Sequence, residues 1–445
     1  MKKKSDGSRH LPTENTSGDI NDVFPHKVCI NLDRRTDRWK RMQVKFDRHE
    51  IRAVRRFSGV DGQGLTVPPS WSSTPGAYGC LLSHLQVVRE ARELGMPSVL
   101  IFEDDVVFDS RLRNDFSAYI SQVPPGWEML HFGALHMDDP IEIAENVHRI
   151  RCAYSTYAYA LKHTIFDAFI ELNSKADTAV DVNNLVLQTE HACYCFTPHL
   201  VWVESGYSDA QEQQKDHWYL QESLVIHGSG MHQLLNHTAL IIAHRNATKN
   251  NSVTQNLLFL TRFYSERLLG ISVVIVEQDA EPTINPEALP EGCRYFFLQD
   301  DGPLNKGLCF NTGMIISHPK RAFMIFSDSD IFVEEWDICG NLRMCQRYDG
   351  TTGFRTIIDL TSTGTLHLQR DTAMLMRWFN EKNYSRSENN GAFSKYCVFK
   401  RRSIQATGGW EDQRPGDADL VLSSKSKQQL RVFASPNHAL RLHHD

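Results

Sequence analysis

One pattern that occurs twice constrains this chain most: an apolar run that ends abruptly in closely spaced carboxylates. The runs are SVLIFEDDVVF at residues 98–108 and AFMIFSDSDIFVE at residues 322–334. The acidic residues are Glu103, Asp104 and Asp105 in the first run, and Asp328 and Asp330 in the second. Each run predicts a strand buried on both faces, and the carboxyl ends of such strands form the ligand-binding edge of open α/β sheets. Paired carboxylates there could share Mg²⁺ or Mn²⁺, which would in turn hold a diphosphate.

Composition sets the broad class. The chain has 445 residues, of which 41% are hydrophobic and 23% charged, so we expect a globular protein of two or three domains. Its net charge of −6 gives no support to nucleic acid as the main partner. No apolar run approaches the roughly 18 residues of a membrane-spanning helix. The ten cysteines form no CxxC pair, which favours buried thiols in a reducing compartment, and we expect a cytoplasmic protein.

The order of elements predicts two similar domains. Residues 1–22 are polar and read as a disordered tail without the apolar core of a secretory signal. Residues 23–225 then alternate expected strands with expected helices, among them a first strand at residues 27–32 and a helix at residues 76–94. Residues 238–445 repeat the alternation, with a helix expected at residues 250–269. Such a βαβ series predicts a largely parallel sheet in each domain. The segment 226–237 (IHGSGMHQLLNH) has the composition of a linker between them.

Four blocks of the first half occur in the order of a known family. They are INLDRRTDRWKRM, FSGVDG, GAYGCLLSHLQVVREA and VLIFEDDVVF, and the similarity extends over residues 27–209. This half resembles glycosyltransferase family 25, which includes lipooligosaccharide β-galactosyltransferases and collagen hydroxylysine galactosyltransferases. The resemblance implies a GT-A fold, which is a Rossmann-like α/β domain. It also implies an inverting transfer, typically of galactose from UDP-galactose.

The end of the first expected strand carries the first candidate donor-binding residues. Asn31, Asp33 and Arg34 lie where a nucleotide docks in such sheets. Arg34 and Arg35 could serve the diphosphate. For Arg38 we favour a solvated position on the basic face of an exposed helix.

The acidic strand and the helix before it supply further candidates. Glu103 and Asp104 are expected to serve the donor and Asp105 the metal. The resemblance favours a site-lining role for Ser83 and His84, although a histidine buried in the helix would give the same pattern. An inverting transfer also needs a base to deprotonate the acceptor hydroxyl. Asp181 in AVDVNNL is our candidate, and a helix N-cap aspartate is the alternative.

The second half resembles the galactosyltransferase-type GT-A domain of glycosyltransferase families 7 and 27, which are related to family 2. The segments that carry this resemblance are LNKGLCFNTGM (304–314), FSDSDIFVE (326–334) and GGWEDQRPGDADL (408–420). The order Gly-Gly-Trp-Glu-Asp departs from the family's fuller Gly-Trp-Gly-Gly-Glu-Asp, which puts the placement of the acceptor in doubt.

The resemblance implies roles for several residues of this half. Asp412 would be the catalytic base beside Glu411, and Trp410 would be a wall for the sugar. His443 or His444 would complete the metal site of Asp328 and Asp330. Two further residues are expected to line the donor pocket, Asn311 and Arg294.

Together these features predict two tandem GT-A domains that form a bifunctional inverting glycosyltransferase. It would add two sugars, at least one of them galactose, from UDP-sugar donors to a glycan acceptor with Mn²⁺ or Mg²⁺. Two alternatives stay open: one domain could be a degenerate glycan-binding module, or the whole chain a scaffold. A sugar nucleotidyltransferase is disfavoured, because Asn31-Leu32-Asp33-Arg34 stands where those enzymes have a Gly-rich phosphate loop.

Overall fold

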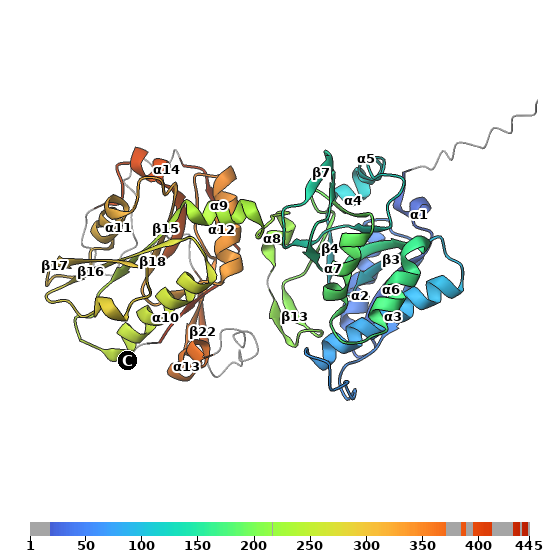
Figure 1. The fold of residues 1–445 in the computed structure, drawn as a ribbon, viewed down its shortest axis with the longest axis horizontal. Helices are drawn as coiled ribbons and strands as arrows, with labels where there is room; N and C mark the ends of the chain where they lie inside the picture. Colours follow the sequence, from blue (N-terminus) through green and yellow to red (C-terminus); the bar gives the residue numbers. More distant parts are fainter. Residues whose placement is uncertain are drawn as a thin grey trace, which may run out of the picture. The chain divides into compact units, whose positions relative to one another are not determined.

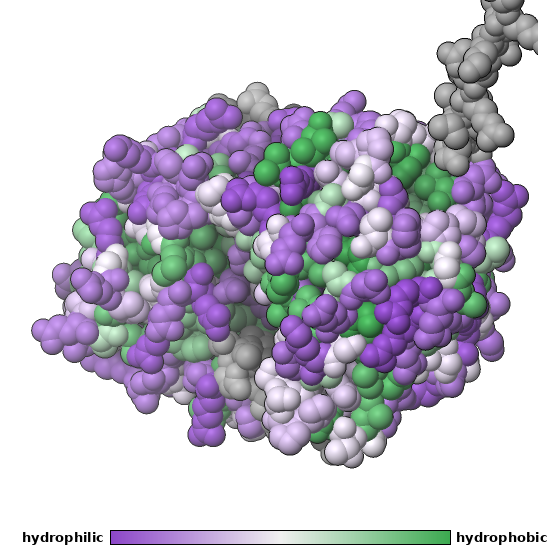
Figure 2. Space-filling view, turned by 45° about the vertical axis from the view of Figure 1, so that its right-hand side comes forward, coloured by the Kyte–Doolittle hydropathy of each residue, from purple (hydrophilic) through white to green (hydrophobic). Residues whose placement is uncertain are grey.

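The computed structural model describes residues 18–215, 217–370, 384–388, 395–411, 430–436 and 438–443. The chain forms two compact units (Figure 1). Unit 1 comprises Met1–Ala134, Ile141–Ile150 and Ser155–Val203, and unit 2 comprises Leu135–Pro140, Arg151–Tyr154 and Glu204–Asp445. Polar and hydrophobic side chains mix on the face shown in Figure 2, as is usual for globular proteins.

Unit 1 is built on an eight-stranded sheet of order β2-β1-β3-β10-β5-β11-β8-β7. Strand β1 (Lys27–Leu32) lies parallel between β2 (Val54–Gly59) and β3 (Ser98–Glu103), so the three carboxyl ends meet at one edge. The sheet continues through β10 (Ala158–Lys162), β5 (Met129–His131), β11 (Cys193–Phe196), β8 (Val147–Arg149) and β7 (Ile141–Ala144). Because β10 runs antiparallel to β3, it brings a distant part of the chain to the acidic end of β3.

Helices α2 (Thr36–Arg48) and α3 (Pro75–Glu93) connect the parallel strands and pack against β1. Helix α3 begins where Thr74 accepts a hydrogen bond from Ala77 N (3.0 Å), with Pro75 in the first turn. The other helices of unit 1 are α1 (Ile20–Val23), α4 (Arg111–Asn114), α5 (Phe116–Ile120), η1 (His163–Ile165), α6 (Phe166–Asn173) and α7 (Val180–Glu190). A small sheet pairs β4 (Val106–Phe108) with β12 (Val201–Val203).

Unit 2 has a seven-stranded sheet of order β17-β16-β15-β18-β23-β20-β24. Four neighbouring strands are parallel: β17 (Arg294–Gln299), β16 (Ser272–Asp279), β15 (Thr238–His244) and β18 (Phe323–Asp328). The remaining strands are β23 (Tyr396–Lys400), β20 (Gly350–Thr351) and β24 (Val432–Phe433). A second sheet joins β19 (Ile331–Phe332), β25 (His438–Arg441), β21 (Thr356–Leu360) and β22 (Tyr384–Glu388).

Helices α10 (Asn251–Arg267) and α11 (Lys306–Ile316) pack on the parallel strands (Figure 1). Helix α12 (Glu335–Arg347) packs on β20 and β23. Helix α11 approaches β15 closely at Gly313, where an added Cβ would lie 2.2 Å from Ile241 Cγ2. The other helices are α8 (Trp218–Gln221), α9 (Ser229–Asn236), η2 (Pro286–Ala288), α13 (Ser362–Arg370) and α14 (Arg401–Ala406). Short strand pairs are β6 (Leu135–His136) with β9 (Ala153–Tyr154), and β13 (Gly206–Ser208) with β14 (Gln213–Lys215).

The expected fold class, two α/β domains with largely parallel Rossmann-like sheets, is confirmed, although antiparallel strands extend both sheets. The segment 226–237, expected to be a linker, contains helix α9, and the compact units divide after Val203 rather than after residue 225. None of the helices in the described ranges is both long and apolar enough to cross a membrane.

Candidate functional site

The acidic end of β3 lies against an arginine of α2. Arg38 Nη1 donates to Asp104 Oδ1 (2.8 Å) and Asp105 Oδ2 (3.2 Å), and Asn31 Nδ2 donates to Asp104 Oδ2 (2.6 Å). Arg38 is only 7% exposed. The solvated position that we favoured for Arg38 is therefore wrong. Its guanidinium belongs to the carboxylate cluster because burial of these acids requires a paired cation.

Two side chains contact the carboxylate of Glu103. Thr156 Oγ1 donates to its Oε1 (2.7 Å), and His84 Nε2 lies 3.5 Å from the same oxygen. Burial opposes ionisation of Glu103, yet its neighbours His84, Thr156 and Arg38 hold its pKa below the usual value. His84 is fully buried, and its Nδ1 lies 3.0 Å from the hydroxyl of Tyr159. The structure thus places His84 next to the acidic cluster, as expected.

Burial disfavours the charged form of two acids near this edge, Asp105 and Asp181. Burial raises the pKa of Asp105 to about 7, and the negative charge of Glu103 adds to this effect. Its Oδ1 is buried without a hydrogen-bond partner among the described residues, which fits a carboxylate that can take a cation. Burial also raises the pKa of Asp181, which lies in the first turn of α7 but is not its N-cap, since Ala179 holds that position.

A more exposed set of charges follows β1. Arg56, on the neighbouring strand β2, donates to Asn31 Oδ1 (2.7 Å) and Asp33 Oδ1 (2.6 Å). The hydrogen bond from Arg56, together with one from Ser58, lowers the pKa of Asp33. Arg34 Nε donates to Asp61 Oδ2 (2.6 Å). Arg56 was missed in the sequence, where it reads as an ordinary residue of an alternating strand.

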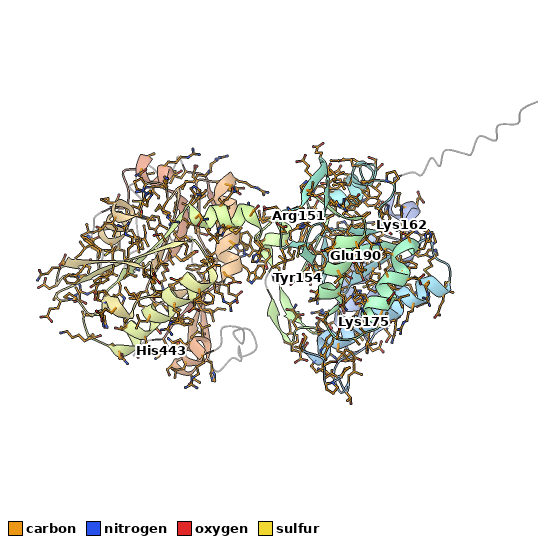
Figure 3. The ribbon with its side chains drawn as sticks, in the orientation of Figure 1. Arg151, Tyr154, Lys162, Lys175, Glu190 and His443 are labelled. Atoms are coloured by element: carbon orange, nitrogen blue, oxygen red, sulfur yellow. The ribbon has the colours of Figure 1, made fainter. Side chains whose placement is uncertain are left out.

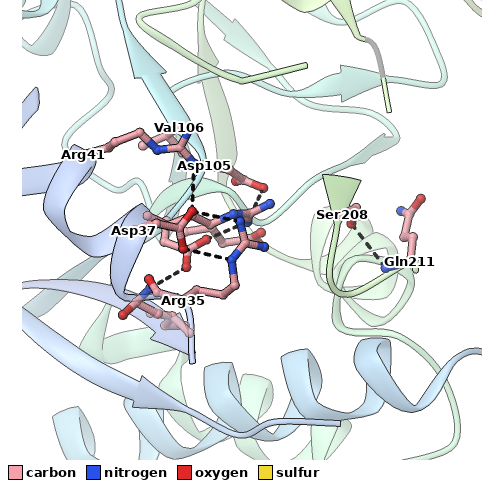
Figure 4. Close-up of polar contacts among 12 residues, drawn as sticks. Arg35, Asp37, Arg41, Asp105, Val106, Ser208 and Gln211 are labelled. Carbon is pink, nitrogen blue, oxygen red and sulfur yellow. Dashed lines mark hydrogen bonds and ion pairs between the residues drawn. The ribbon is translucent and has the colours of Figure 1, made fainter. Parts of the chain in front are cut away.

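Two other residues of the expected diphosphate and donor site make local contacts. Arg35 Nε donates to Asp37 Oδ1 (3.2 Å), and Arg41 lies 3.7 Å from the same carboxylate; Figure 4 draws these residues together with Asp105. Ser83 Oγ donates to Gly79 O (2.7 Å) and accepts from Val60 N (2.8 Å), so its hydroxyl joins α3 to the chain after β2. The site-lining role expected of Ser83 stays a prediction.

In unit 2 the Asp-Ser-Asp segment lies where β18 ends. Lys306, the first residue of α11, pairs with Asp328 Oδ2. Burial raises the pKa of Asp328 to about 6, against the effect of Lys306. Asp328 Oδ1 is buried without a hydrogen-bond partner in the part of the chain that the structure describes. A divalent cation would complete the coordination of such an oxygen, so the residues fit the expected metal.

The end of the chain returns to this segment. Leu442 N donates to Asp330 O (2.8 Å), and the next residue, His443, accepts a hydrogen bond at its carbonyl from Asn256 of α10 (3.1 Å). Figure 3 labels His443. The backbone of the expected histidine ligand thus lies close to the backbone of Asp330. His444 lies outside the described residues.

His244 was missed in the sequence. It ends β15, in register with Glu277 of β16, and follows Ala243, which is the register partner of Asp328 on β18. The side chain is fully buried, and neither ring nitrogen has a hydrogen-bond partner within the described ranges. Burial lowers its pKa to about 4, against the negative charges of nearby Glu277, Asp279 and Asp330. The feature of the sequence that could have revealed it is a histidine at the carboxyl end of an apolar strand.

The expected acceptor segment is only partly described. Trp410 is 3% exposed, and its ring packs against Phe326 (centroids 5.0 Å apart) and Phe310 (5.9 Å). It fills the core, so its expected role as a sugar wall is not what the structure shows. Asn311 Nδ2 donates to Trp410 O (2.8 Å) and its Oδ1 accepts from Trp410 N (2.9 Å), so Asn311 fixes this backbone.

Three further residues of this half were expected to belong to the site. Glu411 follows Trp410 and is partly buried, while Asp412 lies outside the described residues. Arg294 is exposed at the start of β17 and donates to Ile316 O, so it lies at the amino-terminal edge of the parallel strands. The expected donor contact of Arg294 is wrong, because Asp328 ends its strand at the opposite edge.

Comparison with known proteins bears on unit 1. Residues 24–183 match the model of glycosyltransferase family 25 (LPS biosynthesis protein). The resemblance of the N-terminal half to family 25 is confirmed. A putative glycosyltransferase R655 of Acanthamoeba polyphaga mimivirus is 23% identical over 212 residues, which are 42% of this chain and 65% of that protein. Procollagen galactosyltransferase 1 of Danio rerio is 32% identical over 135 residues, 26% of this chain and 22% of that protein.

One relative is named as an inactive member of the family. The human inactive glycosyltransferase 25 family member 3 is 30% identical over 163 residues, 31% of this chain and 27% of that protein. The chain thus spans less than two thirds of the length of each of these relatives.

Among solved structures, the catalytic domain of Drosophila β1,4-galactosyltransferase 7 in complex with xylobiose shows 11% identity and a TM-score of 0.26. The match covers 45% of this chain and 65% of that one. A likeness of this size carries no argument about function. The resemblance of residues 238–445 to families 7 and 27 stays a prediction.

Proposed function

We propose that the chain is a glycosyltransferase that moves sugars from UDP-sugar donors to a glycan acceptor. The observation that carries this proposal is the partly buried group Glu103, Asp104 and Asp105 at the carboxyl edge of parallel strands, within the segment that matches family 25. Three adjacent acids at such an edge are costly unless a cation is bound to them. Arg38 supplies one positive charge, and Asp105 Oδ1, which no group in the described part of the chain hydrogen-bonds, leaves room for another.

In unit 1, different residues would serve the separate parts of a displacement reaction. Asn31 lies near the end of β1, where the nucleotide would dock, and Arg56 of β2 donates a hydrogen bond to its Oδ1. Asp181 would take the proton of the acceptor hydroxyl as its oxygen attacks the anomeric carbon and UDP leaves, because a carboxyl of raised pKa is the better base. Mg²⁺ or Mn²⁺, when bound, would offset the charge of the departing diphosphate.

We extend the proposal to a second transfer in unit 2. Asp328 ends β18 and Asp330 comes after it, just as Glu103 ends β3 and Asp104 and Asp105 come after it. Asp328 Oδ1, which has no hydrogen-bond partner within the described residues, supports a second cation site. His443 adjoins Asp330 in the described backbone and would add a nitrogen ligand. The chain would then add two sugars, at least one of them galactose. The cytoplasmic location expected from the sequence also stays a prediction.

A second candidate is that one unit is inactive and holds the acceptor. The ion pair of Lys306 with Asp328 favours this candidate for unit 2, since the lysine occupies one of the oxygens that a metal would use. The name of the human relative favours it for unit 1.

The test is a screen of UDP-sugars with the full chain and Mn²⁺, in which released UDP is measured for the wild type and two variants. Asp105→Asn should reduce the release that depends on unit 1, and Asp330→Ala the release that depends on unit 2. The control is Asp167→Asn, because this carboxylate is 86% exposed in a surface ion pair. If no donor yields UDP, or if both variants match the control, the proposed sites are wrong. If only one variant differs, a single unit is catalytic.

A further inference from the structure

Three side chains of different chemistry converge between α3 and β3. One ligand atom each from Cys80, His84 and Glu103 lies within 4.8 Å of the other two. Cys80 and His84 are one turn apart on α3, so both project from the same face of the helix. Glu103 ends β3. The parallel strands and the helix between them therefore assemble a sulfur, a nitrogen and an oxygen at one point.

The imidazole of His84 is oriented toward this point. Its Nδ1 lies 3.0 Å from the Tyr159 hydroxyl, and its ring stacks on Tyr159 at an interplanar angle of 30°. Its Nε2 is buried, has no hydrogen-bond partner among the described residues, and lies 3.5 Å from Glu103 Oε1. When Nδ1 carries the proton and donates a hydrogen bond to the Tyr159 hydroxyl, the lone pair of Nε2 is free to face the Glu103 carboxylate. This arrangement, with one nitrogen held and the other presented, is typical of metal-binding histidines.

We propose that Cys80, His84 and Glu103 form a binding site for a divalent transition metal of the Zn²⁺ type. Zn²⁺ binds sulfur at about 2.3 Å and nitrogen or oxygen at about 2.0–2.2 Å, so tetrahedral ligand atoms lie roughly 3.3–3.6 Å apart. The 3.5 Å separation of His84 Nε2 from Glu103 Oε1 fits this spacing. With three protein ligands, the fourth position of the metal would be open to water or a small ligand.

The charges around Cys80 and a hydrogen bond to Glu103 support the same site. Glu103, Asp181 and Asp105 all place negative charge near the Cys80 sulfur. A bound cation would offset this charge and stabilise the thiolate. Thr156 donates to Glu103 Oε1 (2.7 Å) and so fixes the carboxylate. The site differs in chemistry from the all-oxygen group of Asp104 and Asp105, because a thiolate and an imidazole select Zn²⁺ or Co²⁺ over Mg²⁺.

The test uses Co²⁺ as the probe, with the full chain and an excess of Mg²⁺ to saturate oxygen-only sites. The wild type should bind about one equivalent of Co²⁺ with a near-ultraviolet thiolate-to-cobalt charge-transfer band. Cys80→Ser should lose this band, whereas the control Cys152→Ser, at a partly buried cysteine outside the cluster, should retain it. Tyr159→Phe should weaken binding by about 10–100-fold, since it removes only the group that orients His84.

A second measurement does not depend on the folding of any variant. In the wild type, Zn²⁺ should slow alkylation of Cys80 but not of Cys152, as followed by mass spectrometry of the labelled peptides. The proposal is overturned if the wild type shows no charge-transfer band, if Cys80→Ser retains it, or if Zn²⁺ leaves the alkylation rate of Cys80 unchanged. None of these readouts requires transferase activity, so they are independent of the proposed function.

Discussion

Replacing Arg38 with methionine should destabilise unit 1 strongly. The side chains of Arg38, Asp104 and Asp105 are 8%, 10% and 18% exposed, and the arginine lies 2.8 and 3.2 Å from the two carboxylates. Its loss would leave two buried acids without this cation. Breaking a buried pair in this way costs about 3–5 kcal/mol. The matched control is Arg41→Met on the same helix, because Arg41 and its partner Asp37 are 53% and 59% exposed at 3.7 Å, and such pairs contribute about 0–1 kcal/mol.

Hydrogen exchange followed by mass spectrometry can measure this effect in unit 1 alone. Amides of β1 and β3 report the opening of the central sheet, and 3–5 kcal/mol corresponds to exchange faster by about 10²–10⁴-fold. Adding Asp104→Asn and Asp105→Asn to Arg38→Met should restore part of the protection, because the buried charges are then removed together. The reasoning is refuted if Arg38→Met and Arg41→Met accelerate exchange equally, or if the triple variant is less protected than Arg38→Met.

Three further predictions follow from single contacts. Because burial raises the pKa of Asp105 from 3.8 to about 7, the folded chain keeps a proton between these values that the unfolded chain has lost. The free energy of unfolding of unit 1 should therefore fall as the pH rises between these two values. Asp105→Asn removes this titration, so the wild type should lose protection from hydrogen exchange over this pH range relative to the variant. Parallel pH profiles of the two proteins would contradict the prediction. Trp410→Ala should destabilise unit 2 by about 3–5 kcal/mol, measured at amides of β18, whereas a loss of acceptor affinity with unchanged exchange would show that the ring contacts sugar. Tyr264→Phe should cost about 1–3 kcal/mol in the same assay, because the buried Val333 N loses its acceptor at 2.9 Å; an unchanged exchange rate would mean that another group replaces the hydroxyl.

Short-range patterns predicted the elements well. The first strand was expected at residues 27–32, which are the bounds of β1, and the helix expected at residues 76–94 is α3, Pro75–Glu93. The helix expected at residues 250–269 is α10, Asn251–Arg267. These elements depend on hydrophobic spacing and end signals within the segment itself, so no distant residue is needed to recognise them.

The partners of the site residues could not be predicted in this way. Arg38 and Asp104 are 66 positions apart, and Lys306 and Asp328 are 22 apart, so each pair exists only once a helix has packed on its sheet. The charged spacing of α2 is equally consistent with a solvated face and with one arginine buried on a carboxylate. Trp410 shows the same limit, since an aromatic residue beside two acids is typical of both a sugar site and a core edge.

The sequence by itself determined where the carboxylates lie: at the ends of two apolar strands, on the edge where parallel strands finish. This follows because strand direction and side-chain alternation are local properties. Only the tertiary structure decided which charges those carboxylates meet. Strand β10 runs antiparallel to β3 and brings Thr156 and Tyr159 to Glu103 and His84, whereas Lys306 reaches Asp328 from α11. Such contacts depend on the packing of distant elements, and burial then fixes their electrostatics, because a buried charge is stable only beside a partner that the fold supplies.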